Sequence, residues 1–305
     1  MDLKHFHLNN GENFVLKSVT PSRVERQQVI MGIDEAGRGP VLGPMVYGAC
    51  YVASQDQSLL SSLKVADSKT LNEEQRDACF EKIQESADTF GWIAQILSPS
   101  RISRSMLSRC KYNLNAISHD SAMFLIQSVR DMGVKISAVF VDTVGDPDKY
   151  QAKLKERFPT IPMITVSKKA DSLFPVVSAA SVVAKVCRDQ ALKEWRFKEG
   201  SRFPAEVAYG SGYPGDPATK RFLEDYCDPV FGYPQLIRFS WATTTKALES
   251  AVAVKWEEVL VEDESGTPAI TQFFKRQISS LTGPAKEDKR HRYFAERNIS
   301  SVSCF

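Results

Sequence analysis

The fold is decided by a short apolar run that ends in two acids, VIMGIDE at residues 29–35. A run of this length, followed at once by GRGP at residues 37–40, is typical of a buried strand that ends at a turn. A second apolar run extends from Met45 to Ala53. Two apolar strands joined by a Gly- and Pro-containing connection are expected to pair in antiparallel orientation. The sequence therefore predicts the start of a buried sheet here.

The rest of the chain alternates between predicted strands and helices. Strands are predicted over residues 90–97, 136–141 and 163–166, and helices over residues 71–87, 114–132, 174–193, 217–226 and 243–252. The helical segments carry apolar residues at helical spacing, whereas the strand at 136–141 has the nearly continuous apolar character of a strand covered on both faces. This order predicts an α/β fold, with a mixed central β-sheet flanked by helices and a C-terminal helical extension.

Composition limits the functional classes. The 305 residues are 43% hydrophobic and 25% charged, as in ordinary soluble globular proteins, and the net charge is +2. So small an excess argues against binding nucleic acid by bulk positive charge. The six cysteines include no C-x-x-C pair, which argues against a zinc ribbon and suits a reducing compartment. No signal peptide is apparent and no apolar run approaches the ~20 residues of a membrane span, so we expect a soluble cytosolic or nuclear protein without membrane association.

Acids follow three of the apolar segments: Asp34 with Glu35, then Asp142, then Asp171. If these segments are neighbours, four carboxylates meet at one edge of the sheet, where they repel one another unless cations bridge them. Carboxylates without Cys or His partners select Mg²⁺ or Mn²⁺, and two such ions about 4 Å apart promote in-line displacement at a phosphodiester. Asp34 and Glu35 can both reach the ions only if their strand is already ending, because successive strand residues face opposite sides. The alternative is that all four are solvated residues at strand ends.

Two glycine-containing segments are further candidates for ligand contact. In Gly37-Arg38-Gly39 the glycines allow close approach of the backbone and Arg38 offers a guanidinium that matches a phosphate. In GSGYP, residues 210–214, Tyr213 is placed to stack on a sugar or a base and to donate its hydroxyl. The alternatives are a tight turn for the first segment and a surface turn with a half-buried tyrosine for the second.

Together with further motifs along the chain, these segments resemble a known family. Residues 31–47, MGIDEAGRGPVLGPMVY, are similar to the opening strand of type 2 ribonuclease H (the ribonuclease HII family). Similar motifs follow in the family's order at residues 67–71 (DSKTL), 141–145 (VDTVG), 169–172 (KADS), 178–186 (SAASVVAKV), 210–214 (GSGYP) and 238–241 (RFSW). The resemblance covers about residues 29–245. The DTVG form and the long C-terminal region resemble the eukaryotic catalytic subunit rather than a single-chain bacterial enzyme.

The resemblance implies a ribonuclease H-like fold and a heterotrimer with two non-catalytic subunits. It implies metal-dependent hydrolysis of RNA in RNA·DNA hybrids and incision 5′ of single ribonucleotides embedded in duplex DNA, giving 3′-OH and 5′-phosphate ends. Asp34, Glu35, Asp142 and Asp171 match the family's metal-binding catalytic acids. Gly37, Arg38 and Gly39 match residues that contact the ribose 2′-OH, and Tyr213 matches one that verifies the ribonucleotide.

With this resemblance the chain is divided into four parts. We expect an extended N-terminal arm at residues 1–27, a ribonuclease H-like catalytic domain at 28–225, a C-terminal helical extension at 226–258 and a partner-binding tail at 259–305. A nuclear location is predicted, and a cytoplasmic one is left open.

Basic and amide side chains beside the predicted active-site segments are candidate nucleic-acid contacts: Lys69, Lys185, Arg188 and Asn113. Solvated basic residues, and helix capping by Asn113, explain these positions equally well.

The tail contains TPAITQFF, residues 267–274, which resembles a sliding-clamp-binding box with Thr267 in place of the leading Gln. Ile270, Phe273 and Phe274 are therefore candidates for binding the clamp. Packing of the same three residues on a sister subunit is the favoured alternative, since such apolar groups are otherwise exposed.

Two rival functions stay open at this stage. One is another nuclease of ribonuclease H fold, such as a resolvase, which needs no sensor for a 2′-OH. The other is a non-catalytic scaffold that binds RNA·DNA hybrids, which needs no set of four acids.

Overall fold

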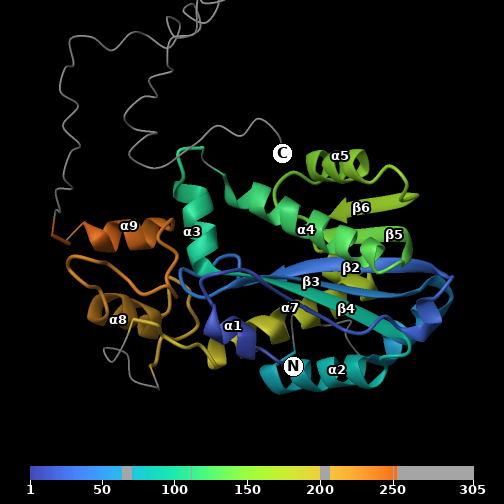
Figure 1. Cartoon of the computed structure of the whole chain (residues 1–305), viewed down its shortest axis with the longest axis horizontal. Coiled ribbons are helices and arrows are strands. Elements are labelled where there is room, and N and C mark those ends of the chain that lie inside the picture. The colour runs from blue at the N-terminus through green and yellow to red at the C-terminus, as the bar shows by residue number, and fades with distance from the viewer. Residues whose placement is uncertain (64–70, 111, 200–206, 250, 253–305) are drawn as a thin grey trace, which may run out of the picture. The chain divides into compact units, whose positions relative to one another are not determined.

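The centre of the molecule is a six-stranded mixed sheet in the order β1-β4-β3-β2-β5-β6 (Figure 1). The computed structural model describes residues 1–63, 71–110, 112–199, 207–249 and 251–252. The strands are β1 (Phe14–Lys17), β2 (Gln28–Ala36), β3 (Met45–Ala53), β4 (Phe90–Leu97), β5 (Lys135–Asp142) and β6 (Met163–Ser167). Strands β2, β3, β4 and β1 pair antiparallel, and β2, β5 and β6 pair parallel. The predicted antiparallel pairing of β2 with β3 and the mixed sheet are confirmed.

Helices flank this sheet and continue beyond one end of it. They are α1 (Lys4–Leu8), α2 (Glu73–Glu85), α3 (Pro99–Leu107), α4 (Leu114–Asp131), α5 (Pro147–Arg157), α6 (Ala170–Leu173), α7 (Pro175–Lys193), α8 (Pro217–Asp225) and α9 (Ala242–Leu248), with short 3₁₀ helices at Ser22–Val24 and Ser54–Leu63. Asn72 begins α2 with a full capping box to Gln75, as the sequence predicts. Proline occupies the first turn of α5, α7 and α8, where its missing N–H costs nothing.

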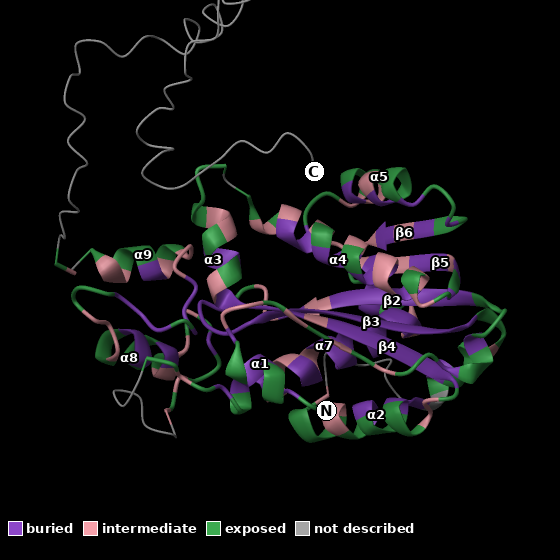
Figure 2. Cartoon of the chain, in the orientation of Figure 1, coloured by how far each residue is buried: buried purple, intermediate pink, exposed green. Residues whose placement is uncertain are grey.

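The sheet separates two hydrophobic cores. On one face α7 and α2 cover Ile30, Val46 and Cys50. On the other face α4 and α5 cover Met31, Ile33 and a set of neighbours from β3 and β5. In Figure 2, β2, β3 and most of α7 are coloured as buried, since they lie between the two cores. This is why those strands read as nearly continuous apolar runs in the sequence.

Helix α7 lies unusually close to the sheet because two glycines face it. A Cβ atom on Gly32 would come within 2.3 Å of the Val176 carbonyl oxygen, and one on Gly48 within 2.7 Å of the Ala180 carbonyl oxygen. No side chain fits at either position, so the backbones of the helix and of strands β2 and β3 are in direct contact. The small residues of α7 that the sequence shows serve this contact.

The N-terminal segment differs from its prediction as an extended arm. Residues 4–8 form α1, whose Phe6 is buried against Trp195, with ring centroids 5.9 Å apart. Residues 14–17 form β1, which adds an edge strand to the sheet through pairs such as Phe14 with Ile96. The polar composition concealed this, because β1 is half exposed and only a few aromatic residues anchor the segment.

The C-terminal helices belong to the same compact unit as the sheet, which extends to residue 253. An isolated bridge pairs Ile237 with Leu42, directly after the Gly-Arg-Gly segment. Helix α9 ends at Leu248 rather than at residue 252. The predicted tail at 259–305 lies outside the described residues. Of the helices in the described ranges, none is long and apolar enough to cross a membrane.

Candidate active site

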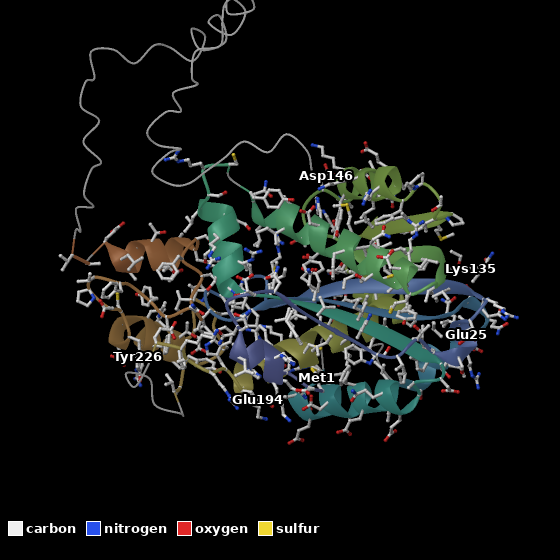
Figure 3. The ribbon with its side chains drawn as sticks, in the orientation of Figure 1. Met1, Glu25, Lys135, Asp146, Glu194 and Tyr226 are labelled. Carbon is white, nitrogen blue, oxygen red and sulfur yellow. The ribbon has the colours of Figure 1, made fainter. Side chains whose placement is uncertain are left out.

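The acids that the sequence singled out lie at one edge of the sheet. Lys135 begins β5 and Glu25 precedes β2 at the opposite end (Figure 3), so both strands run from there toward the acids. Asp34 and Glu35 are near the end of β2, and Asp142 is the last residue of β5, its parallel neighbour. The carboxyl ends of neighbouring parallel strands lie at the same sheet edge. Asp171 is in α6, between β6 and α7.

The acids are close enough to affect one another's ionisation. Burial, with added repulsion from Asp142 and Asp171, raises the pKa of Asp34 to about 7, against the opposing effect of the hydrogen bond from the Glu35 amide. Burial also raises the pKa of Glu35 to about 8, with added repulsion from Asp34 and Asp142. This convergence is what the sequence predicts for the four residues, which we call the acid cluster.

The cluster is arranged differently from the sequence prediction in one respect. Strand β2 does not end before the acids but pairs with β3 as far as Ala36, with Asp34 opposite Gly48 and Glu35 opposite Tyr47. Asp34 therefore faces α7, on the side of Gly32, whereas Glu35 faces the α4 and α5 side. The strand ends one residue after Glu35, so both carboxylates still lie at its end although they face opposite sides.

Backbone groups hold two of the carboxylates. The Oδ1 atom of Asp34 accepts from the Glu35 amide at 2.8 Å, and Oδ1 of Asp142 accepts from the Ala170 amide at 2.9 Å. Asp171 follows Lys169, which adopts a left-handed conformation with φ of 56°. Such a conformation strains a residue that has a Cβ atom, and it turns the chain sharply so that Asp171 is buried beside β5.

The donor chemistry fits a divalent metal ion. All four side chains are carboxylates that are buried or half buried, and Oε2 of Glu35 is buried without a hydrogen-bond partner. A hard divalent cation would offset the repulsion between the carboxylates and give the unpaired Glu35 oxygen a partner. Within the described residues, no three acidic, His or Cys side chains enclose a single ion as they stand. Side-chain rotation at the sheet edge is therefore required to bind one.

The Gly-Arg-Gly loop, residues 37–39, is held from the C-terminal segment. The guanidinium of Arg238 is fully buried and donates to the carbonyl oxygens of Gly37 (2.6 Å), Arg38 (3.1 Å) and Gly43 (2.9 Å). The indole N–H of Trp241 donates to the Gly39 carbonyl at 3.1 Å, and the Arg238 guanidinium lies 4.8 Å from the Trp241 ring centroid. All three carbonyls of the loop are thus engaged inside the protein.

The side chain of Arg38 does not extend into solvent. It donates to the hydroxyl of Ser118 and to Oδ1 of Asn115 at 2.5 Å, both on α4. Its positive charge lowers the pKa of Glu35 against the larger effect of burial. Arg38 therefore connects the Gly-Arg-Gly loop, α4 and the acid cluster.

Tyr213 lies directly against this loop. A Cβ atom on Gly39 would come within 3.2 Å of Cε1 of Tyr213, and 52% of Tyr213 remains exposed. Its segment is fixed by Asp216, which accepts from the amide and the hydroxyl of Ser211 at 2.7 and 2.6 Å. The Gly212 carbonyl accepts from the Val41 amide at 2.8 Å, which fastens the two glycine segments together.

The other candidate nucleic-acid contacts differ in how far they are engaged inside the protein. Asn113 caps α4 by accepting from the Ala116 amide at 2.9 Å, as the capping alternative expects. Arg188 is largely buried, is paired with Asp189 and donates to the Ser211 carbonyl, so it supports the Tyr213 segment. Lys185 is half buried on α7. Lys69, Ile270, Phe273 and Phe274 lie outside the described residues.

A shallow hollow of about 470 Å³ opens beside the Gly-Arg-Gly loop. It is lined by Arg38, Gly39, Met106, Leu114, Ser240, Trp241 and Ala242. The sequence marks Arg238 and Trp241 as part of a motif but assigns them no role. A basic and an aromatic residue far along the chain carry no pattern that shows which loop they support.

The comparisons with known proteins agree with this geometry. The family model for Ribonuclease HII matches residues 31–244. The A subunit of ribonuclease H2 from Rattus norvegicus is 49% identical over 99% of both chains.

Solved structures share the fold. The ribonuclease H2 of Pyrococcus horikoshii matches with a TM-score of 0.60 at 29% identity, over 73% of this chain and 98% of that one. A ribonuclease HII of Archaeoglobus fulgidus, solved in a complex with PCNA, matches with a TM-score of 0.57 at 27% identity, over 70% and 95%. A Bst ribonuclease HIII, solved in complex with Mn²⁺, shares the fold at 21% identity, with a TM-score of 0.51 over 76% and 71%. The chain, with its ribonuclease H-like sheet and its ordered set of motifs, therefore belongs to the ribonuclease HII family.

Proposed function

We propose that this chain is the catalytic subunit of a ribonuclease H complex. It hydrolyses RNA in RNA·DNA hybrids and incises duplex DNA 5′ of a single embedded ribonucleotide, leaving 3′-OH and 5′-phosphate ends. One observation carries the proposal: a cluster of four acids lies beside a glycine loop whose carbonyls are all engaged inside the protein. A phosphodiester substrate needs positioning and positive charge more than a protein nucleophile.

Asp34, Glu35, Asp142 and Asp171 are the proposed ligands of two divalent ions, Mg²⁺ or Mn²⁺. When bound, such ions supply the activated water and the charge that stabilises the leaving oxygen. The protein contributes the anchoring, since backbone amides fix one oxygen each of Asp34 and Asp142. Burial and mutual repulsion disfavour the charged carboxylates in the metal-free chain, so binding of cations releases protons.

The Gly-Arg-Gly loop and Tyr213 are the proposed sensor for the ribose 2′-OH. Because Arg238 and Trp241 occupy the loop's carbonyls, its N–H groups are the polar groups that remain for a ligand. The exposed Tyr213 ring lies against Gly39, where it can stack on a sugar. A site built to hydrogen-bond a hydroxyl rejects the substrate that lacks it far better than an apolar pocket does.

Phosphate contacts are proposed for Lys69 and Lys185, whose positions flank the active-site motifs. The structure supports a different task for Arg188, which is committed to Asp189 and Ser211. Arg188 therefore acts on the substrate through the Tyr213 segment rather than by direct contact. A change in the salt dependence of binding in Lys69→Ala and Lys185→Ala, with none in Arg188→Ala, is the expected result.

Two non-catalytic subunits and a nuclear location complete the proposal. They rest on similarity to a ribonuclease H2 chain of Rattus norvegicus along nearly the whole sequence. For Ile270, Phe273 and Phe274 we favour binding to a sister subunit over a sliding clamp of the PCNA type. Isothermal titration of the 262–280 peptide with the clamp separates the two, since heat at micromolar concentration contradicts our preference.

The decisive assay uses a DNA duplex with one embedded ribonucleotide, with and without Mg²⁺. Cleavage 5′ of the ribonucleotide only when Mg²⁺ is present is the expected outcome. Cleavage of an all-DNA duplex instead indicates a resolvase-like nuclease. Binding without cleavage, in the full chain supplied with its partner subunits, indicates a scaffold.

A further inference from the structure

Behind Glu35 lies a group of buried polar atoms that the proposed reaction does not use. Tyr47 on β3 is the direct cross-strand partner of Glu35, so the two side chains lie on the same face of the sheet. Tyr150, on α5, reaches the same place from the covering layer. Both tyrosines are at most 1% exposed. The hydroxyl of each, like Oε2 of Glu35, is buried and makes no hydrogen bond of normal geometry within the described part of the chain.

The three groups interact with one another. Burial raises the pKa of both tyrosines far above its ordinary value, and the charge of Glu35 contributes to each shift. Tyr150 also raises the pKa of Tyr47. Both hydroxyls therefore keep their protons at neutral pH and are hydrogen-bond donors, whereas the Glu35 carboxylate, once ionised on binding a cation, can only accept.

Neighbouring residues fix this group in place. The His119 ring stacks on Tyr150 with centroids 3.8 Å apart, which sets the plane of the phenol ring. Ser118, the residue before it, accepts a hydrogen bond from Arg38. The positive charge of Arg38 lowers the pKa of both tyrosines, so it acts on the same group.

Three buried polar atoms without partners in one place are costly unless they satisfy one another, directly or through a bound water. We propose that Tyr47 and Tyr150 are positioning residues that donate to the rear oxygen of Glu35 through one shared water, so that its other oxygen is presented to the metal ion. A ligand carboxylate held from behind in this way binds its ion more tightly, because its orientation is fixed in advance. This inference rests on the proposed metal site at the acid cluster.

The test compares three tyrosine-to-phenylalanine variants of the full-length chain. Tyr47→Phe and Tyr150→Phe remove the two hydroxyls and keep the rings. Tyr51→Phe is the matched control, because Tyr51 lies on the same strand and face as Tyr47, is fully buried and also has an unpaired hydroxyl. The polar groups that shift its pKa are Ser18, Cys50 and Thr20, none of them an acid.

Isothermal titration with Mn²⁺ alone is the first readout. We expect Tyr47→Phe and Tyr150→Phe each to weaken Mn²⁺ binding about 10-fold, the lower end of the effect of losing a partner of a metal ligand. Tyr51→Phe should leave it unchanged. Equal Mn²⁺ affinity in all variants overturns the inference. Absence of Mn²⁺ binding by the wild-type chain overturns the proposed metal site together with it.

Thermal denaturation of the metal-free variants is the second readout, and it works even where Mn²⁺ binding is lost altogether. Removing a hydroxyl that is hydrogen-bonded lowers the melting temperature, whereas removing one that is unpaired leaves it unchanged or raises it. A lower melting temperature for Tyr47→Phe and Tyr150→Phe supports the cluster. An unchanged or higher melting temperature for both contradicts it.

Discussion

The acid cluster and the Gly-Arg-Gly loop are adjacent in space but are held by opposite means. The acids are placed by the elements that carry them, since Asp34 lies near the end of β2, Asp142 ends the parallel strand β5, and both bond to nearby backbone. The loop has no regular structure of its own and is held by Arg238 and Trp241, about 200 residues away. In the proposed function, the chemical step thus depends on the sheet, and the recognition of the substrate depends on the C-terminal segment. The two should therefore fail separately when mutated.

The largest effect is expected from a substitution in the acid cluster alone. Asp142→Asn should lower kcat on the order of 10³-fold, since several kcal/mol of transition-state stabilisation depend on the bound cations. The loop is untouched, so binding of the ribonucleotide-containing duplex should persist. Steady-state kinetics and a binding titration check both points. A loss of less than tenfold in kcat would remove Asp142 from the proposed ligands.

Removing the support of the Gly-Arg-Gly loop alone should first lower the stability of the protein. Arg238→Met removes the donor from three carbonyl oxygens, one buried and two partly buried, at about 1–3 kcal/mol each, so the free energy of unfolding should fall by roughly 3 kcal/mol. Urea denaturation measures it. The exposed Arg221 on α8 offers a matched control, and Arg221→Met should have little effect. Equal effects of the two substitutions would contradict the role given to Arg238.

A smaller effect is expected where the loop meets the substrate. Tyr213→Ala should lower kcat/KM for an embedded ribonucleotide about 10- to 100-fold, since stacking on an aromatic ring is worth about 1–3 kcal/mol. Tyr213→Phe keeps the ring against Gly39 and should lose less. The ratio of activity on an embedded ribonucleotide to activity on a long hybrid reports the role. Identical losses in both variants would assign the whole effect to the hydroxyl.

The smallest effect is expected on stability when the pH is changed. The folded-state pKa values of Asp34 and Glu35 are about 7 and 8, above those of the unfolded chain. The folded metal-free chain therefore binds protons that the unfolded chain has released, and its stability should fall as pH rises through 7 to 8. Thermal denaturation from pH 5.5 to 9 tests this. Saturating Mn²⁺ should reduce the dependence, and a metal-free chain that gains stability with rising pH would contradict it.

Features placed by their own local segment could be predicted from the sequence, whereas features held by distant residues could not. The strands, the main helices and the convergence of Asp34, Asp142 and Asp171 follow from local pattern, because apolar runs end in acids at neighbouring strand ends. The end of β2 could not be predicted, since pairing with β3 carries the strand through Ala36 and leaves Asp34 and Glu35 on opposite faces. The partners of Arg38 on α4 and the burial of Arg238 depend on tertiary contact alone. The prediction for residues 1–27 was wrong because edge strands carry a weak apolar pattern.

The missing side chains of Gly32 and Gly48 set a dimension of the active site. Asp171 lies in α6, the short helix that precedes α7, whereas Asp34 and Asp142 lie at the ends of strands, so the separation of these carboxylates depends on the spacing between helix and sheet. That spacing is fixed by backbone contact at the two glycines, and Gly48 lies directly opposite Asp34. A single methyl group at either position would move one acid relative to the others without touching any of them. The distance between helix and sheet thus sets the spacing of the proposed metal ligands, and it is encoded by two residues that have no side chain.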